Sequence, residues 1–248
     1  MSLMFALAFT TACGNDDDDG ASDGDTDGDT DGDTDGDTDS DTDGDTDGDS
    51  DADWDMFEDF EDYNAGDYIV ATAGYPWVTW SDPSLPDEDA QVSDAMSVSG
   101  KNSLYIVDNN DVVWMLEFTS GHWLVEFEMF IEEGKVGYYN FQQVFTGDAN
   151  GVWAFEMYFY SGGVGNCVIA GKQYPFKFKE GVWFTASHDI DIDNDVATIT
   201  VDGKKVYSWP WSTAQGKPPG NADGIDFYGF PDPPGSGYWM DDVRYRDL

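Results

Sequence analysis

The chain is poor in basic side chains. It contains 10 Lys and Arg residues against 52 Asp and Glu residues, which gives a formal net charge of −42 at pH 7. A chain this acidic repels the phosphates of nucleic acids and of anionic lipid headgroups. We therefore expect no nucleic-acid partner and no electrostatic binding to a membrane surface.

Histidine and cysteine are scarce as well, with two residues of each. His188 shares one face of an alternating segment with Phe184, Ala186 and Ile190, so we expect it in the core. Only His122 remains, and one residue supports neither a histidine-based metal site nor a catalytic triad. Cys167, in the apolar stretch NCVIA, is expected to be buried and unreactive.

Aromatic residues are almost absent from the first 53 positions, where only Phe5 and Phe9 occur. Residues 13–53 consist mainly of Asp, Gly and Thr and provide no apolar face for a core. We predict a disordered acidic tether that charge repulsion extends. Its strict alternation never puts an acid at position 12 of an EF-hand-like loop, so specific calcium sites are not expected there.

The tether follows a short apolar segment, Leu3–Phe9, and a cysteine. Thr10-Thr11-Ala12-Cys13 resembles the lipobox of bacterial lipoproteins, although Leu three places before the cysteine and a basic start are missing. The resemblance implies a signal peptide at 1–12, lipidation of Cys13, and a membrane contact through this anchor alone. The following GNDDDD resembles the acidic stretch of lipoproteins exported to the cell surface, which implies an outer-membrane or cell-surface location facing outward. The alternative is an ordinary signal peptide with an unmodified cysteine.

No stretch of twelve residues shows a helical period; from Trp54 onward the residues alternate instead. WLVEFEMFIEE places Trp123, Val125, Phe127, Met129 and Ile131 on one face, opposite Glu126 and Glu128. WAFEMYFY places Trp153, Phe155, Met157 and Phe159 on one face, opposite Glu156, Tyr158 and Tyr160. Hairpin turns are indicated at 193–195 and at Asp202-Gly203. We predict one all-β domain over 54–248, a two-sheet antiparallel jelly-roll sandwich of thirteen or fourteen strands.

Several segments of this domain resemble the concanavalin A-like lectin and glucanase superfamily. ATITVDGKKVYSW is similar to its strand–turn–strand unit, and MDDVRY to the closing strand of laminarinase-type glucanases. FEDF near the start and SGKNSLYI at 99–106 fit the same plan. The resemblance covers roughly residues 56–248 and implies two curved antiparallel sheets, one of which forms a concave glycan-binding face.

Two pairs of side chains are candidates for carbohydrate chemistry. Glu126 and Glu128 lie about 6.6–7 Å apart along one strand, a separation compatible with a glycosidase pair. However, the laminarinase-type signature needs a further acid where this chain has Phe130 and Ile131. We therefore expect these acids to contact a ligand or solvent, and to be catalytic only if the protein is an enzyme.

Tyr158 and Tyr160 share a face with Glu156, and we expect this surface to continue to Glu126 and Glu128. Aromatic rings stack on the C–H face of a sugar, and carboxylates accept hydroxyl hydrogen bonds. The sequence thus predicts a ligand-binding set with one further tyrosine, which comprises Glu126, Glu128, Glu156, Tyr158, Tyr160 and Tyr138. Looser candidates are Trp77, Trp80, Trp209 and Trp211.

A structural calcium ion is implied by the resemblance alone. Laminarinase-type domains often hold one between their N-terminal and final strands. The matching positions here are Asp241, with Asp242 as a substitute, and Glu58. DIDNDVATITVD is a poor calcium loop by comparison, because Val196 stands where such a loop requires glycine.

The sequence therefore predicts a surface-tethered, non-catalytic module that binds a neutral polysaccharide. One alternative is a divergent glycoside hydrolase or polysaccharide lyase. The other is an adhesion or structural module whose partner is a protein.

Overall fold

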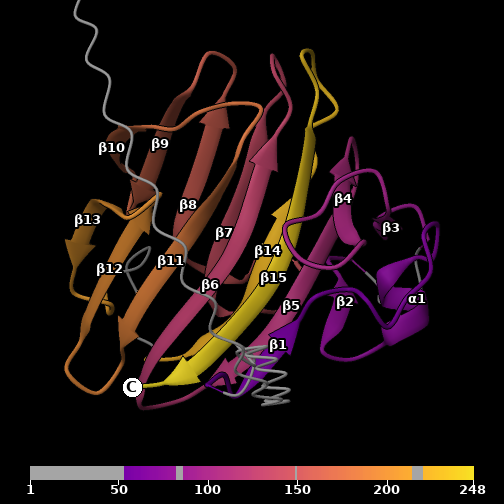
Figure 1. Cartoon of the computed structure of the whole chain (residues 1–248). Coiled ribbons are helices and arrows are strands. Elements are labelled where there is room, and N and C mark those ends of the chain that lie inside the picture. Colours follow the sequence, from indigo (N-terminus) through magenta and orange to yellow (C-terminus); the bar gives the residue numbers. More distant parts are fainter. Residues whose placement is uncertain (1–52, 82–85, 149, 214–219) are drawn as a thin grey trace, which may run out of the picture. The chain divides into compact units, whose positions relative to one another are not determined.

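The structure, a computed structural model, describes residues 53–81, 86–148, 150–213 and 220–248 (Figure 1). The predicted signal peptide, Cys13 and the tether up to residue 52 lie outside the described residues. The described part contains one short helix, α1 (Ile69–Ala73), and is otherwise built from strands. No helix in it is both apolar enough and long enough to cross a membrane.

The strands form two antiparallel sheets packed face to face, as the sequence predicted (Figure 1). The eight-stranded sheet contains β1 (Met56–Glu58), β3 (Gln91–Ser93), β4 (Ser103–Val107), β6 (His122–Ile131), β11 (Trp183–Asp191), β12 (Val196–Val201), β13 (Lys204–Trp209) and β15 (Gly237–Asp247). Its order is β13-β12-β11-β6-β15-β4-β3, with β1 paired to β15.

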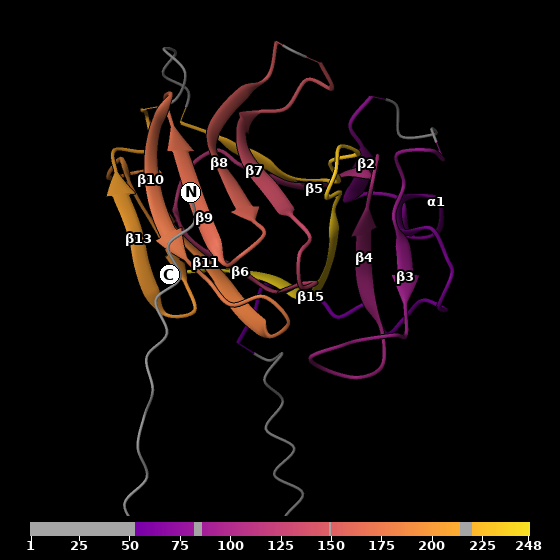
Figure 2. The same ribbon diagram turned by 90° about the horizontal axis from the view of Figure 1, so that it is seen from above.

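The seven-stranded sheet contains β2 (Trp77–Thr79), β5 (Asp111–Phe118), β7 (Gly137–Val144), β8 (Val152–Tyr160), β9 (Val164–Ile169), β10 (Lys172–Lys177) and β14 (Ala222–Tyr228). Its order is β10-β9-β8-β7-β14-β5-β2. Figure 2 shows the two sheets from above as separate layers, with β6, β11 and β15 in one and β5, β7 and β8 in the other.

The two hairpin turns read from the sequence are confirmed. β11 pairs with β12 across residues 192–195, and β12 pairs with β13 across Asp202-Gly203. Both residues of the second turn have positive φ, 51° and 67°, which is the conformation of a type I′ turn and explains the Asp-Gly pair.

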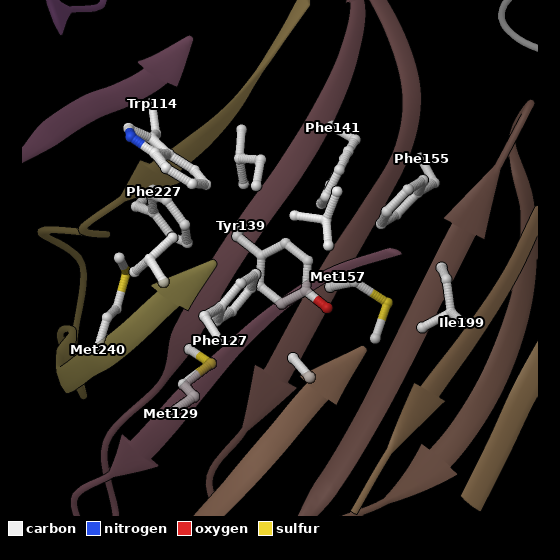
Figure 3. Packing of buried hydrophobic residues seen from close by; sticks show 14 of the residues in the cluster. Trp114, Phe127, Met129, Tyr139, Phe141, Phe155, Met157, Ile199, Phe227 and Met240 are labelled. Atoms are coloured by element: carbon white, nitrogen blue, oxygen red, sulfur yellow. The ribbon is translucent and has the colours of Figure 1, made fainter. Parts of the chain in front are cut away.

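Large apolar side chains fill the space between the sheets. Phe127 of β6 meets Tyr139 of β7 edge-on, with ring centroids 5.0 Å apart, and Figure 3 shows the Tyr139 ring in the middle of this cluster. Phe155 and Met157 of β8 are buried in the same layer. This core fixes which side chains of each strand must point outward.

His188 and Cys167 are core residues, as expected. The Nδ1–H of His188 donates to the Val125 carbonyl at 3.1 Å, so Nε2 accepts from the Tyr139 hydroxyl at 2.8 Å. Burial lowers the pKa of His188 to about 3 and raises the pKa of the Cys167 thiol to about 12. The imidazole is therefore neutral and the thiol protonated at neutral pH.

Candidate functional site

The sequence-predicted ligand residues lie on two opposite surfaces of the sandwich. Glu126 and Glu128 point outward from β6 in the eight-stranded sheet, whereas Glu156 and Tyr158 point outward from β8 in the seven-stranded sheet. Because the inner faces of the sheets pack together, the outer faces look in opposite directions (Figure 2). The expectation that these residues form one surface is wrong, since alternation identifies the inner face of a strand but not the sheet to which the strand belongs.

Glu126 and Glu128 are paired with a cation on their own sheet. The Arg244 Nη2 atom lies 3.4 Å from Glu126 Oε2 and 3.6 Å from Glu128 Oε1. Thr185 Oγ1 also donates to Glu128 at 2.9 Å. Burial raises the pKa of Glu128, and Thr185 and Arg244 counteract that rise. These contacts give the two acids a structural role in a partly buried ion cluster.

The outer face of the seven-stranded sheet gathers polar and aromatic side chains from neighbouring strands. In the antiparallel register Asn140 of β7 lies between Glu156 of β8 and Asp226 of β14. Two residues further along the same face of these strands, Tyr138 lies opposite Tyr158. Residues next to these in sequence, such as Tyr139 and Phe227, point into the core. The strand pairing thus assembles a site from residues far apart in the chain.

Hydrogen bonds hold these side chains in place. The hydroxyls of Tyr138 and Tyr158 both donate to Glu156 Oε1, at 3.1 and 2.7 Å. Asn140 Nδ2 donates to Asp226 Oδ2 at 2.6 Å and to the Tyr138 hydroxyl at 3.2 Å. Asn140 is only 1% exposed, yet its Oδ1 atom accepts no hydrogen bond within the described chain. An unsatisfied buried acceptor of this kind is costly unless a ligand or water supplies a donor.

Asp111 and Asp226 form a carboxyl pair at the same site. The Oδ1 atom of each is buried and meets no N–H or hydroxyl donor in the described residues. Burial raises the pKa of Asp111, and the neighbouring Asp226 raises it further. Burial also raises the pKa of Asp226, but hydrogen bonds from Asp111 and Asn140 limit that rise. Burial and mutual repulsion thus favour one proton shared between the two carboxyls, and the pair titrates as one unit.

Three connected hollows cross this region. The central hollow, of about 250 Å³, is lined by Trp80, Asp111, Tyr138, Asn140, Trp153, Tyr158, Asp226, Tyr228 and Phe230. It shares Tyr158 and Phe230 with the apolar hollow, which is lined by Val136, Gly137, Tyr158, Phe159, Tyr160, Phe230, Asp232, Pro233 and Pro234. It shares Asp111 and Tyr228 with a larger hollow of about 800 Å³, which we call the acidic hollow because Asp87, Glu88, Asp89 and Asp108 also line it.

Trp153 lies on this outer face and not on the predicted inner one. In the β7–β8 ladder Phe141 faces Phe155 and Gln142 faces Trp153, which leaves Ala154 as an extra residue in β8. Such a β-bulge shifts the alternation by one position. Trp153 consequently stacks on Trp80, with ring centroids 5.9 Å apart.

The other candidates divide between the site and the core. Tyr160 is 44% exposed and lines the apolar hollow, where it stacks on Tyr158. Among the looser tryptophan candidates only Trp80 reaches the site. Trp77, Trp209 and Trp211 are buried in the core, which removes them from any ligand surface.

Sequence reasoning missed Asp111, Asn140, Asp226, Tyr228 and Phe230. A local signal existed in GIDFYGF, where Ile225 and Phe227 read as inward-facing and Asp226 as outward-facing. The sequence did not indicate which strands lie beside β14. This strand pairs with β5 and β7, which occur more than seventy residues earlier in the chain.

The predicted calcium ligands are already occupied by protein donors. Asp241 accepts from the backbone N–H groups of Val98 and Ser99 through Oδ2 and of Asp242 through Oδ1. Glu58 accepts from Phe60 N–H and the Tyr63 hydroxyl. In the described ranges no group of three or more His, Cys, Asp or Glu side chains is arranged to hold a metal. These residues therefore do not fit the ion in this arrangement, and the calcium remains a prediction from resemblance.

No protein-family model matches the sequence, and no curated protein matches it either. The fold does match solved structures. The catalytic domain of a glycoside hydrolase family 131 protein from Coprinopsis cinerea superposes with a TM-score of 0.50 at 12% identity, over 79% of this chain and 94% of that one. This likeness shows the fold alone.

Two further matches are weaker. The Emp47p carbohydrate recognition domain gives a TM-score of 0.44 at 10% identity, over 74% of this chain and 94% of that one. A longer protein described as a sialidase gives 0.45 at 14% identity, with 74% of this chain covered. The match spans only 18% of that sialidase. The chain is thus a two-sheet β-sandwich that shares its fold with the glycoside hydrolase family 131 domain.

Proposed function

We propose that the outer face of the seven-stranded sheet binds a polysaccharide without cleaving it. The observation that carries the proposal is the central hollow, where aromatic rings and the Asp111–Asp226 pair surround the buried Asn140 Oδ1 atom, an acceptor with no partner in the described chain. The sandwich fold, which a glycoside hydrolase domain shares, is compatible with this use.

The chemistry of the hollow suits a sugar. Tyr158, Trp153 and Phe230 offer flat apolar surfaces for the C–H faces of pyranose rings. Asn140 Oδ1 and the Asp111–Asp226 pair offer acceptors for hydroxyl groups. The bonds from Tyr138 and Tyr158 to Glu156 fix the rings before a ligand arrives, so little conformational entropy is lost on binding.

The lining of the three hollows also favours uncharged over anionic polymers. In the described chain they contain several carboxyl groups and no Lys or Arg side chain. A uronic-acid polymer such as alginate or pectate would be repelled, most strongly at low salt.

The proposal of binding without turnover is supported by the distances that glycosidases need. Their two carboxyl groups stand about 5–5.5 Å apart in retaining enzymes and about 6.5–9.5 Å in inverting ones. Asp111 and Asp226 share a hydrogen bond, and the oxygens of such a bond lie about 2.5–3.0 Å apart, which is shorter than either range. Glu126 and Glu128 are engaged by Arg244 on the opposite face.

A glycoside hydrolase is the second candidate, and one observation favours it. Burial raises the pKa of both carboxyls of the pair, and a buried carboxyl that retains a proton can act as a general acid beside an ionised partner. This reading needs a ligand to separate the two side chains.

A glycan array combined with reducing-sugar and unsaturated-product assays on the full chain separates these functions. We expect binding to neutral polysaccharides and no product. Product release that disappears in Asp226→Asn would establish the enzyme, and loss of all glycan binding would favour a protein partner.

We further propose that a lipid on Cys13 anchors the domain at the cell surface. The Asp-rich segment 13–53 would then hold it away from the membrane. Cys13→Ala should release the protein from the membrane fraction. Tight membrane association of that variant would place the anchor elsewhere.

A further inference from the structure

The acidic hollow lies where the turn 107–110 joins β4 to β5. It is lined by Tyr68, Pro86, Asp87, Glu88, Asp89, Gln91, Tyr105, Val107, Asp108, Asn109, Asn110, Asp111 and Tyr228. Five of these residues carry a carboxyl group, and none of the described lining residues is basic. The eight-stranded sheet, by contrast, brings Arg244 to its outward-facing acids.

Some of these carboxylates have structural roles and others have free oxygens. Asp89 is saturated by backbone N–H groups, since Oδ1 accepts from Val70 and Ala90 and Oδ2 from Ala71. Among the described residues, Glu88 accepts through Oε2 alone, from Ser81 N–H at 2.9 Å. Asp108 uses only Oδ1, with Ser236 N–H at 2.9 Å.

The second oxygens of Glu88 and Asp108 have no hydrogen-bond donor in the described chain. The position of Glu88 is well defined, because its carbonyl accepts the Asp111 N–H at 2.8 Å. The charge of Glu88 is also close enough to Asp111 and Asp226 to raise the pKa of both. The negative charge of Glu88 thus acts on the carboxyls of both the acidic and the central hollow.

A second observation points to a ligand that extends from this hollow. Asp111 and Tyr228 line both the acidic and the central hollow. In the central hollow the buried Asn140 Oδ1 lacks a donor. A single ligand that lies across both hollows would need an apolar face that stacks on the protein's aromatic rings at one end. At its other end it would need a positive charge.

We propose that this groove takes an amino-sugar polysaccharide with free, protonated amino groups, and this inference rests on the proposed function. Sugar rings would lie over Tyr158 and Trp153, while an ammonium group of a neighbouring sugar residue would lie in the acidic hollow, which Glu88 and Asp108 line. A neutral sugar supplies hydroxyl donors but leaves the carboxylate charges uncompensated as water is excluded. A lysine-rich peptide supplies the charge but no pyranose face for the rings.

The test compares three β-1,4-linked hexasaccharides that differ only at carbon 2. Cellohexaose has a hydroxyl there, the N-acetylglucosamine hexamer an acetamide, and the glucosamine hexamer a free amine. Affinity for the full chain is measured by titration calorimetry at low salt and again in 0.5 M salt. We expect the amine to bind about tenfold more tightly than the hydroxyl at low salt, and this advantage to shrink with salt.

The acidic tether could also attract an amine, so the control varies the hollow alone. Glu88→Gln/Asp108→Asn keeps the tether and both hydrogen-bond acceptors, and should lose the amine advantage while binding cellohexaose as before. The matched variant Asp62→Asn/Asp202→Asn removes two exposed charges outside the hollows and should retain most of the advantage. Glu88→Gln alone serves if the double variant melts below the assay temperature.

Each outcome decides the inference. Equal affinity for the amine and the hydroxyl overturns it and leaves polysaccharide binding intact. An amine advantage that survives in Glu88→Gln/Asp108→Asn also overturns it, because the tether or another surface is then responsible. If none of the three hexamers binds, the amino-sugar inference is wrong. The glycan array then tests separately whether the protein binds another polysaccharide.

Discussion

The two outer faces of the sandwich contain the same kinds of side chain but use them differently. The eight-stranded face carries Glu126 and Glu128 and the rings of Phe130, Trp183 and Trp239, with ring centroids 5.6–5.7 Å apart. The seven-stranded face carries Asp111 and Asp226 among Tyr138, Tyr158 and Tyr228. In the described ranges, only the first of these two acid pairs lies beside a cation, Arg244 of the neighbouring β15.

The difference shows that a carboxylate's role depends on what the adjacent strands bring to it. β15 places a guanidinium beside the acids of β6, so their charge is balanced within the protein. β5 and β7 place a second carboxyl and an amide beside Asp226, so charge and hydrogen-bonding capacity remain for a ligand. We assign the first arrangement to stability and propose that the second serves binding.

The largest effect is expected from Arg244→Met. It leaves Glu126 and Glu128 partly buried without their cation, and removes the contact of Arg244 with the Trp54 ring, 4.9 Å from its centroid. We expect the free energy of unfolding to fall by about 2–3 kcal/mol, below the value for a fully buried pair because the contacts are long. Urea denaturation measures it.

Glycan affinity should stay unchanged in the same variant. A variant that is as stable as the parent but binds glycans more weakly would reverse the roles assigned to the two faces.

The next effect concerns affinity. Tyr158→Ala removes a ring of the central hollow, and we expect binding to weaken by about 1–3 kcal/mol. The matched variant Trp183→Ala removes a ring from the opposite face and should bind like the parent. If the two variants weaken binding equally, the loss is an indirect consequence of destabilisation.

A smaller effect concerns pH. Because the pKa of Asp111 is raised in the folded state, the folded chain keeps a proton that the unfolded chain releases above about pH 4. The contribution of this group to stability is therefore complete below about pH 4 and is lost as pH rises toward the raised pKa.

Asp111→Asn removes this titration and retains a donor for Asp226. Between pH 5 and 8 the variant should lose less stability than the parent, by up to about 1.4 kcal/mol for each pH unit over which the folded parent keeps this proton. Parallel curves of melting temperature against pH for the two proteins would show that Asp111 ionises normally.

The smallest effect is expected from chelation. Asp241 and Glu58 already accept hydrogen bonds from the chain, so EDTA should change the melting temperature by less than about 1 °C. A fall of several degrees that calcium reverses would restore the ion predicted from resemblance.

Local patterns predicted much of the fold. Alternation in β6 and β8 and the Asp202-Gly203 turn are local properties of the chain, and they correctly indicated an antiparallel sandwich. The predicted inner face of β8 was wrong only at Trp153, because the bulge at Ala154 depends on its pairing with β7.

The candidate site was predicted in part. Glu156, Tyr158, Tyr160 and Tyr138 do lie together, since β7 and β8 are a hairpin and neighbours in sequence. Asp111 and Asp226 come from strands paired across more than a hundred residues, and nothing in the local sequence specifies that pairing. The same limit placed Glu126 and Glu128 on the wrong surface.

Mapping of the bound sugar by NMR tests the central claim most directly. Amide chemical shifts of the full chain are recorded with increasing amounts of the tightest-binding hexasaccharide. We expect the largest changes in β7, β8 and β14, with few in β6, β11 and β15. Changes concentrated in β6, β11 and β15 would contradict that claim and would place the ligand beside Glu126 and Glu128.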